Sequence, residues 1–317
     1  MQLTAITRKS ALMAILLLVV ILVAAALRSR LAPFAVELAN SEYSERVVSL
    51  VVSMIILFAA GIVEGKMLPR SGLSKGYCTL PIPIYGILAC GLFVAPNIMI
   101  TAIASFSFAM AIYLLLRSLH HAGEKDSIFF AAMLLGGMVL LYPPCVVLAG
   151  VIPIAIFTLA LSPCQMLLMA VGYLLPIFGA SYIMWYLGGE FLDLSKNIAQ
   201  SLMLSRMDAI AQIPYAAILI VVAVVAMLLW GAVYAIARPD KMFLLTRVRR
   251  SLYLFVWVTL LSATILLFPS CDLSAAAIIA VPLTILLCFV LNLLPNNHAT
   301  IAYWVLLGLF VLHLFIA

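Results

Sequence analysis

Charged residues are scarce in this sequence. Asp, Glu, Lys and Arg make up 9% of its 317 residues, whereas about a quarter of a soluble domain is charged. Hydrophobic residues make up 67%, which is more than the polar residues could cover in a water-soluble fold. A soluble globular protein is therefore excluded, and most of the chain must have lipid as its solvent.

The sequence motifs of many soluble enzymes are lacking as well. There is no phosphate-binding Walker loop, no Gly-x-Ser-x-Gly and no dinucleotide fingerprint. The four histidines and the carboxylates form no recognised metal-binding motif, and no Cys-x-x-Cys is present. We therefore expect no cofactor and no metal site. Cys145 and Cys271 fall near the same predicted surface and could form a disulfide in an oxidising compartment.

Long apolar runs are what the sequence has instead. They lack the period-two alternation of membrane β-strands, so they predict an all-α polytopic bundle of transmembrane helices. We expect about eleven spans in one integral-membrane domain over residues 1–317. Ten to twelve spans are possible, because residues 128–161 could instead form a re-entrant pair. The predicted spans are 11–27, 47–63, 79–95, 97–116, 128–142, 145–161, 166–187, 216–237, 252–268, 273–294 and 299–316.

Proline and glycine mark the ends and contacts of these spans. The prolines in "VAPNI" at 94–98 and "YPPC" at 142–145 predict tight turns between neighbouring helices. The pair Gly136–Gly137 predicts close helix packing, and Gly188–Gly189 predicts the end of a helix.

None of the predicted spans contains Asp, Glu, Lys or Arg. Ion-coupled transporters usually keep ionisable groups within the membrane. On this prediction, a carrier driven by protons or sodium is disfavoured.

The basic residues predict the orientation. With the N-terminus in the cytoplasm, twelve Lys and Arg lie inside and five lie outside, as the positive-inside rule requires. The net charge of +6 is then explained by basic inner loops, above all 238–250, beside anionic lipid head groups. The charge gives no reason to expect a nucleic-acid partner.

Two predicted outer loops, 28–46 and 188–215, concentrate the acidic residues. Both are expected to form amphipathic helices at the outer interface, the second with Phe191, Leu194, Ile198 and Leu202 at near-helical spacing. Glu42 precedes Arg46 by four residues and can pair with it on a helix surface. Alternatively, these carboxylates frame an outward-facing cavity and serve as a base or metal contact.

Three phrases carry a resemblance to a known family. They are "LPIPIYGILACGLFVAPN" at 80–97, "GGMVLLYPPCVVLAG" at 136–150 and "GYLLPIFGASYIMWYLG" at 172–188. They resemble a family of polytopic inner-membrane proteins of Bacteroidetes that is classified only as a domain of unknown function. The resemblance implies a multi-pass protein of the bacterial inner membrane and cell envelope, and it supplies no activity.

The layout is also similar to that of lipid-linked glycosyltransferases and O-antigen polymerases, which place essential carboxylates or arginines in outer loops. This similarity implies a base or metal contact among the outer-loop carboxylates and a polyprenyl-phosphate contact among the outer-loop arginines. The candidate carboxylates are Glu37, Glu45 and Glu42, and the candidate arginines are Arg28, Arg30 and Arg206.

Three functional hypotheses follow, and each expects the lipid bilayer as a partner. The first is a membrane scaffold or assembly factor that binds other membrane proteins, which a tightly packed bundle would favour. The second is an outer-face enzyme on a polyprenyl-linked glycan, which a lateral groove at Glu37–Glu45 would favour. The third is a carrier for a neutral or amphiphilic solute, with a polar path lined by Asn97, Ser105 and Asn292.

Overall fold

The chain folds as a bundle of apolar helices. The computed structural model describes residues 42–74, 78–91, 98–118, 125–203, 215–237, 246–268, 271 and 275–316. These residues contain no strand, and six of their helices are long and apolar enough to cross a membrane. The prediction of an all-α integral membrane protein is therefore confirmed. The count of eleven spans stays a prediction, and the first predicted span, 11–27, lies outside the described residues.

The described part of the chain consists mainly of helices. Short 3₁₀ segments are named η. The elements are α3 (Glu42–Ser71), α4 (Pro81–Gly91), α5 (Ile98–Ser118), α6 (Lys125–Leu141), η1 (Pro143–Gly150), α7 (Val151–Leu159), α8 (Pro163–Tyr186), α9 (Asp193–Met203), α11 (Tyr215–Ala237), α12 (Thr246–Ala263), η3 (Thr264–Leu267), α13 (Ala276–Leu293) and α14 (Asn296–Ile316).

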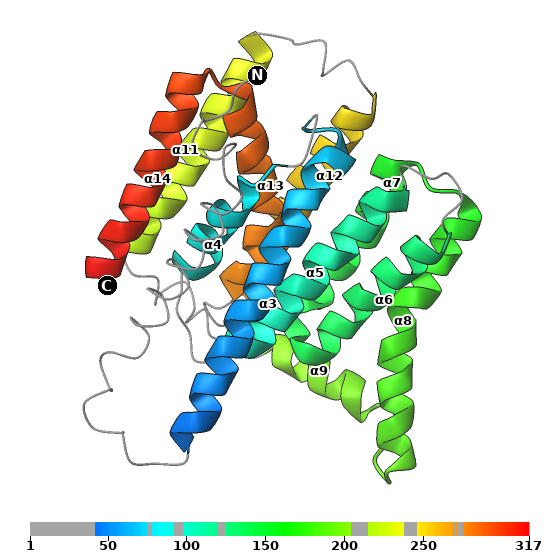
Figure 1. The fold of residues 1–317 in the computed structure, drawn as a ribbon. Coiled ribbons are helices and arrows are strands. Elements are labelled where there is room, and N and C mark those ends of the chain that lie inside the picture. The colour runs from blue at the N-terminus through cyan, green and yellow to red at the C-terminus, as the bar shows by residue number, and fades with distance from the viewer. Residues whose placement is uncertain are drawn as a thin grey trace.

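Neighbouring helices make a continuous series across the molecule. The order of contacts is α14, α11, α13, α4, α3, α5, α6 and α8, and Figure 1 shows α14 and α8 at opposite sides. Helix α13 is the centre, because 78% of its apolar stretch is buried, against 22% for α8 and for α11. The core therefore lies where α13 meets the short helix α4 and the long helix α3.

The tightest packing joins α6 to α8. A Cβ atom added at Gly172 would stand 2.7 Å from the carbonyl oxygen of Phe129, which no side chain tolerates. Gly136 meets the backbone of Tyr173 in the same way, which confirms the predicted packing role of this glycine. Membrane helices associate through such close contacts because lipid provides no hydrophobic driving force between them.

The turn at Tyr142 separates α6 from the next span, as "YPPC" predicted. Tyr142 is extended, and Pro143 starts η1, which continues directly into α7. The 3₁₀ form rises about 2 Å per residue. Pro143–Leu159 can therefore reach roughly 30 Å, the thickness of the hydrocarbon core. This explains how a short apolar segment can cross the membrane.

Helix α9 is the surface helix that the second acidic loop predicted. Leu194, Ile198 and Leu202 form a half-buried stripe, while the charged side chain of Lys196 is exposed. The end of α8 before it is also as predicted, since Gly188 has a φ of +96°, a conformation that glycine adopts without strain. In the first acidic loop, Glu42 and Glu45 belong to the first turns of α3. The surface helix predicted for this loop stays a prediction, because residues 28–41 lie outside the described residues.

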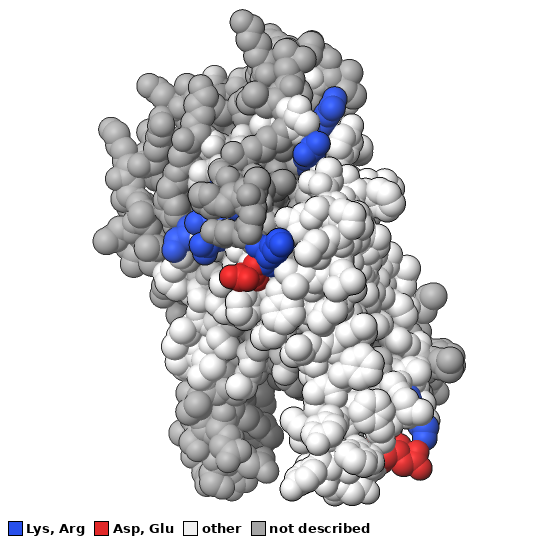
Figure 2. All heavy atoms as spheres, turned by 90° about the vertical axis from the view of Figure 1, so that its right-hand side faces the viewer, with Lys and Arg blue, Asp and Glu red and all other residues white. Residues whose placement is uncertain are grey.

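The outer surface of the bundle suits lipid. Figure 2 shows the face on which α8 lies, where Lys, Arg, Asp and Glu gather in a few small groups and leave a broad surface without charge. Large apolar side chains are exposed on α7 and α8, among them Phe157 at 84% and Leu167 at 68%. Exposed apolar area on this scale indicates contact with the lipid bilayer.

Candidate functional site

The most unusual side chain of the described bundle is Glu64. The predicted span 47–63 stops just before it, but α3 continues to Ser71 and its apolar stretch runs from Val51 to Ser71. The prediction that no span contains Asp, Glu, Lys or Arg is therefore wrong. A carboxyl group is costly within a membrane, where such residues usually serve a function.

Glu64 lies on the buried stripe of α3. Its side chain is 0% exposed, like those of Ala60 and Met67, which flank it on the same face of the helix. The stripe repeats every three or four residues, which is the spacing of one helix face. Its members are Ser53, Leu57, Ala60, Glu64, Met67 and Ser71, and all are buried.

The carboxyl group lies where α3, α4 and α13 meet. One turn before it, a Cβ atom at Gly61 would be 3.5 Å from the Cα atom of Ile82, so α4 packs closely on this face. On α13, which packs against both α3 and α4, the buried thiol of Cys288 lies near Glu64 and Cys78. We call Glu64, Cys78, Cys288 and Asn292, which follows Cys288 by one turn of α13, the polar junction.

Two members of the polar junction have unused hydrogen-bonding capacity. Neither carboxyl oxygen of Glu64 has a hydrogen-bond partner within the described residues, and neither does the buried Nδ2 of Asn292. A buried polar group without a partner destabilises a protein by about 1–3 kcal/mol, and an isolated ionised carboxylate would destabilise it far more. Burial without a partner favours the uncharged form of the Glu64 carboxyl group, which can take part in new hydrogen bonds.

The hydroxyl groups on the α4–α5 side are already engaged. The Tyr85 hydroxyl donates to Ser105 Oγ at 3.0 Å, and Ser105 Oγ donates to the carbonyl oxygen of Ala102 at 2.9 Å. Ser105 is fully buried, so in this conformation it joins two helices and does not line an open path. Asn97, the other predicted path residue of this region, lies outside the described residues.

Arg70, which follows Glu64 on α3, has an aromatic neighbour. Its guanidinium carbon lies 4.2 Å from the centre of the Tyr113 ring on α5. A cation over an aromatic face is a favourable contact when water is excluded. The end of α3 is thus fixed to α5, two turns beyond Glu64.

The structure leaves the sequence-predicted outer-loop site untested. The backbone of Glu42 and Glu45 belongs to the first turns of α3, but the structure does not describe their side chains. The hypothesis of an outer-face enzyme therefore remains a prediction. The other predicted site residues, Arg28, Arg30, Glu37 and Arg206, lie outside the described residues.

The possible disulfide between Cys145 and Cys271 is not formed. Both are buried thiols without a disulfide, and the hydroxyl group of Tyr142 donates to Cys271 Sγ at 3.3 Å. The contact ties the turn after α6 to the segment after η3, so the thiol of Cys271 serves as a hydrogen-bond acceptor.

Histidine, cysteine and carboxylate side chains do not gather into a metal site in the part of the chain that the structure describes. Protein-family models, curated proteins and solved structures were compared with the chain, and none matches it. The inference about function therefore rests on the geometry of the polar junction.

Proposed function

We propose that the protein is a carrier of the bacterial inner membrane that moves a neutral or amphiphilic solute and uses Glu64 as a proton-binding group. The observation that carries this proposal is the fully buried Glu64 carboxyl group, without a hydrogen-bond partner in the described residues, inside an apolar span. The sequence disfavoured a proton-driven carrier because no predicted span contained Asp, Glu, Lys or Arg. Glu64 inside an apolar span removes that argument.

A carrier accounts for Glu64 better than a scaffold does. A scaffold needs only a stable bundle, and apolar side chains of similar volume usually stabilise a core at least as well as buried ionisable groups. A carrier needs a group that is neutral when buried and charged when water reaches it. Glu64 on a buried stripe meets the first condition, and a change in the packing of α3, α4 and α13 would provide the second.

A proton suits the polar junction better than a metal ion. Hard divalent cations take six or more oxygen ligands or keep their own water. The described side chains of the junction offer the two oxygens of Glu64, the amide of Asn292 and the thiols of Cys78 and Cys288. One carboxyl group is sufficient to bind one proton, and the amide and thiols can form hydrogen bonds to a solute.

The proposal includes eleven spans and a cytoplasmic N-terminus. The described helices support it, because each predicted span from 47–63 to 299–316 overlaps a helix or a pair of consecutive helices, and α4 covers part of the span 79–95. Figure 1 shows the end of α3 and the start of α12 at one end of the bundle and α9 at the other. The first end carries Arg70, Arg249 and Arg250, as an inner surface should.

Proton binding can be tested without knowing the solute. The purified protein is reconstituted and its infrared difference spectrum is recorded between acidic and alkaline buffer. We expect a protonated-carboxyl band that disappears in Glu64→Gln and shifts in Glu64→Asp. The matched control is Glu190→Gln, which removes an exposed carboxylate on the surface beside α9 and should leave the band unchanged.

Transport is tested separately with proteoliposomes on a solid-supported membrane. Neutral and amphiphilic solutes are screened for a charge displacement that depends on a proton gradient. A solute that gives a current in the wild type and none in Glu64→Gln would support the carrier. If no solute gives a current, while deletion of the protein disrupts a membrane complex, the scaffold is the better account.

A further inference from the structure

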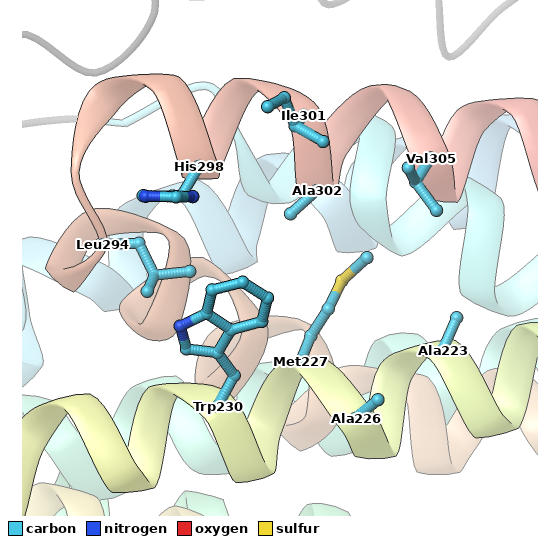
Figure 3. Close-up of a pocket in the computed structure, with 9 residues that line it drawn as sticks. All are labelled: Ala223, Ala226, Met227, Trp230, Leu294, His298, Ile301, Ala302 and Val305. Carbon is cyan, nitrogen blue, oxygen red and sulfur yellow. The ribbon is translucent and has the colours of Figure 1, made fainter.

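A groove separate from the polar junction lies between α11 and α14. Figure 3 shows two facing rows of side chains with a hollow between them. The row on α11 is Ala223, Ala226, Met227 and Trp230, and the row on α14 is His298, Ile301, Ala302 and Val305. Each row repeats at three- and four-residue steps, so each is one face of its helix.

The hollow exists because small residues occupy both rows. Ala226 and Ala302 leave the space that larger side chains would fill, and Leu294 completes the lining. The cavity has a volume of about 260 Å³, which is below the roughly 300–1,000 Å³ of sites for drug-sized ligands. It could hold part of one hydrocarbon chain but not a whole lipid.

The groove faces the bilayer. Ile301 and Val305 on its wall are 61% and 47% exposed, and α11 and α14 are side by side at one edge of the bundle. An apolar hollow on a lipid-facing surface has hydrocarbon chains as its solvent. Its natural occupant is therefore an acyl chain.

One end of the groove is polar. The ring of His298 lies 5.7 Å from that of Trp230, and the two close this end. They lie where α11 approaches its end and α14 begins, which is also the end where α12 starts with the exposed Arg249 and Arg250. Basic side chains near the membrane surface attract anionic lipids.

We infer that the groove binds one acyl chain of an anionic phospholipid, with the head group at the His298 end. The chain would run from Trp230 and His298 towards Ala223 and Val305, along the small residues. The apolar lining binds the chain, and the basic end of the bundle selects the head group. This inference does not depend on Glu64 or on transport.

Tryptophan fluorescence can test the site directly, because Trp230 lines it. Trp185, Trp257 and Trp304 are replaced by Phe, so that Trp230 is the only tryptophan. The variant is reconstituted in phosphatidylcholine that contains a small fraction of phosphatidylglycerol or phosphatidylcholine with brominated chains, which quench a tryptophan in contact with them. We expect brominated phosphatidylglycerol to be enriched about fivefold at Trp230, equivalent to about 1 kcal/mol for one basic side chain near the membrane surface.

Two kinds of variant provide the controls. A chain whose only tryptophan is Trp185, which is 54% exposed near the end of α8, should be quenched in proportion to the bulk lipid. Filling the groove with Ala226→Leu and Ala302→Leu should abolish the enrichment at Trp230. Ala232→Leu, at an exposed position of α11 outside the groove, should leave it intact.

The inference is overturned by either of two results. Equal quenching of Trp230 by the two brominated lipids would show that the head group is not selected. Enrichment that persists in the filled variant would show that the chain does not lie in the groove. The thermal midpoint of each variant is measured first, and if the filled variant is unfolded, Ala302→Val replaces it as a smaller filling substitution.

Discussion

The backbone carbonyl oxygen of Tyr173 on α8 occupies the space that a side chain at Gly136 of α6 would need. The neighbouring contact is reciprocal, since Gly172 of α8 meets the carbonyl oxygen of Phe129 on α6. The two backbones approach this closely because both positions lack a Cβ atom. Gly137, the next residue, has nothing within 4 Å of its would-be Cβ atom, so adjacent glycines differ in role.

This difference predicts opposite effects of two alanine substitutions. Gly136→Ala should push α6 from α8 and lower the free energy of unfolding by about 1–3 kcal/mol, the usual effect of overpacking. Gly137→Ala should be neutral or stabilising by up to about 1 kcal/mol, because alanine favours a helix. Thermal unfolding of both variants in the same detergent measures the difference. Equal midpoints would show that the two helices are not in close contact.

The ion pairs of Lys196 predict a pH dependence. Its ammonium group lies 2.6 Å from Glu190 Oε2 and 3.7 Å from Asp193 Oδ1. The hydrogen bond to Glu190 and the charge of that carboxylate raise the pKa of Lys196 above its ordinary value. A raised pKa in the folded state stabilises the fold below the unfolded pKa, and this contribution disappears as the pH rises through the folded pKa.

The comparison is between the wild type and Lys196→Gln. At neutral pH the wild type should have a slightly higher thermal midpoint, and the gap should close in alkaline buffer. The gap should also shrink at high salt, because both partners are exposed to solvent and screened. A gap that widens with pH would have the wrong sign for this ion pair.

The described cysteines should differ in their reactivity. Cys164 is exposed, whereas Cys145, Cys271 and Cys288 are buried. Brief treatment of the folded protein with a maleimide should label Cys164, and the three buried thiols should react only after denaturation. Peptide mapping by mass spectrometry identifies the labelled positions. A disulfide-linked Cys145–Cys271 peptide that disappears on reduction would contradict the unbridged thiols of the structure.

Opposite ends of the bundle should face opposite sides of the membrane. Lys196→Cys on α9 should react with a membrane-impermeant maleimide added to intact spheroplasts. Arg250→Cys at the start of α12 should react only after the membrane is permeabilised. The native cysteines can also react, so the unsubstituted protein is labelled in parallel and its signal is subtracted. Labelling of both positions from one side would contradict the eleven-span arrangement.

Much of the fold could be predicted from sequence because lipid restricts the possibilities. A run of apolar residues in a membrane has to be a helix or part of a barrel, so composition alone indicated the class. Local signals were also sufficient for the turn at Tyr142, for the packing at Gly136 and for the surface helix α9. Each of these depends on the residue itself and its near neighbours in the chain.

Glu64 was missed because an apolar run ends at the first charged residue, whereas a helix does not. Hydropathy stopped the span at Val63, but the buried spacing continues through Glu64, Met67 and Ser71. Extending the three- and four-residue repeat from Leu57 and Ala60 would have placed Glu64 on the core face. That Cys288 lies near it depends on the packing of α13 against α3, which no local pattern specifies.

The last prediction is that the Glu64 side chain reduces stability in the described conformation. Its oxygens lack partners in the described residues, so an apolar side chain of similar size should pack there without the loss of about 1–3 kcal/mol that an unsatisfied buried group causes. Glu64→Met should therefore raise the thermal midpoint, while Glu64→Gln, which keeps unsatisfied polar atoms, should change it little. A stabilising substitution that abolishes the infrared carboxyl signal and any proton-dependent current would be the usual trade-off at a functional site. A lower midpoint for Glu64→Met would instead mean that the carboxyl group holds the bundle together, and Glu64 would then be a structural residue.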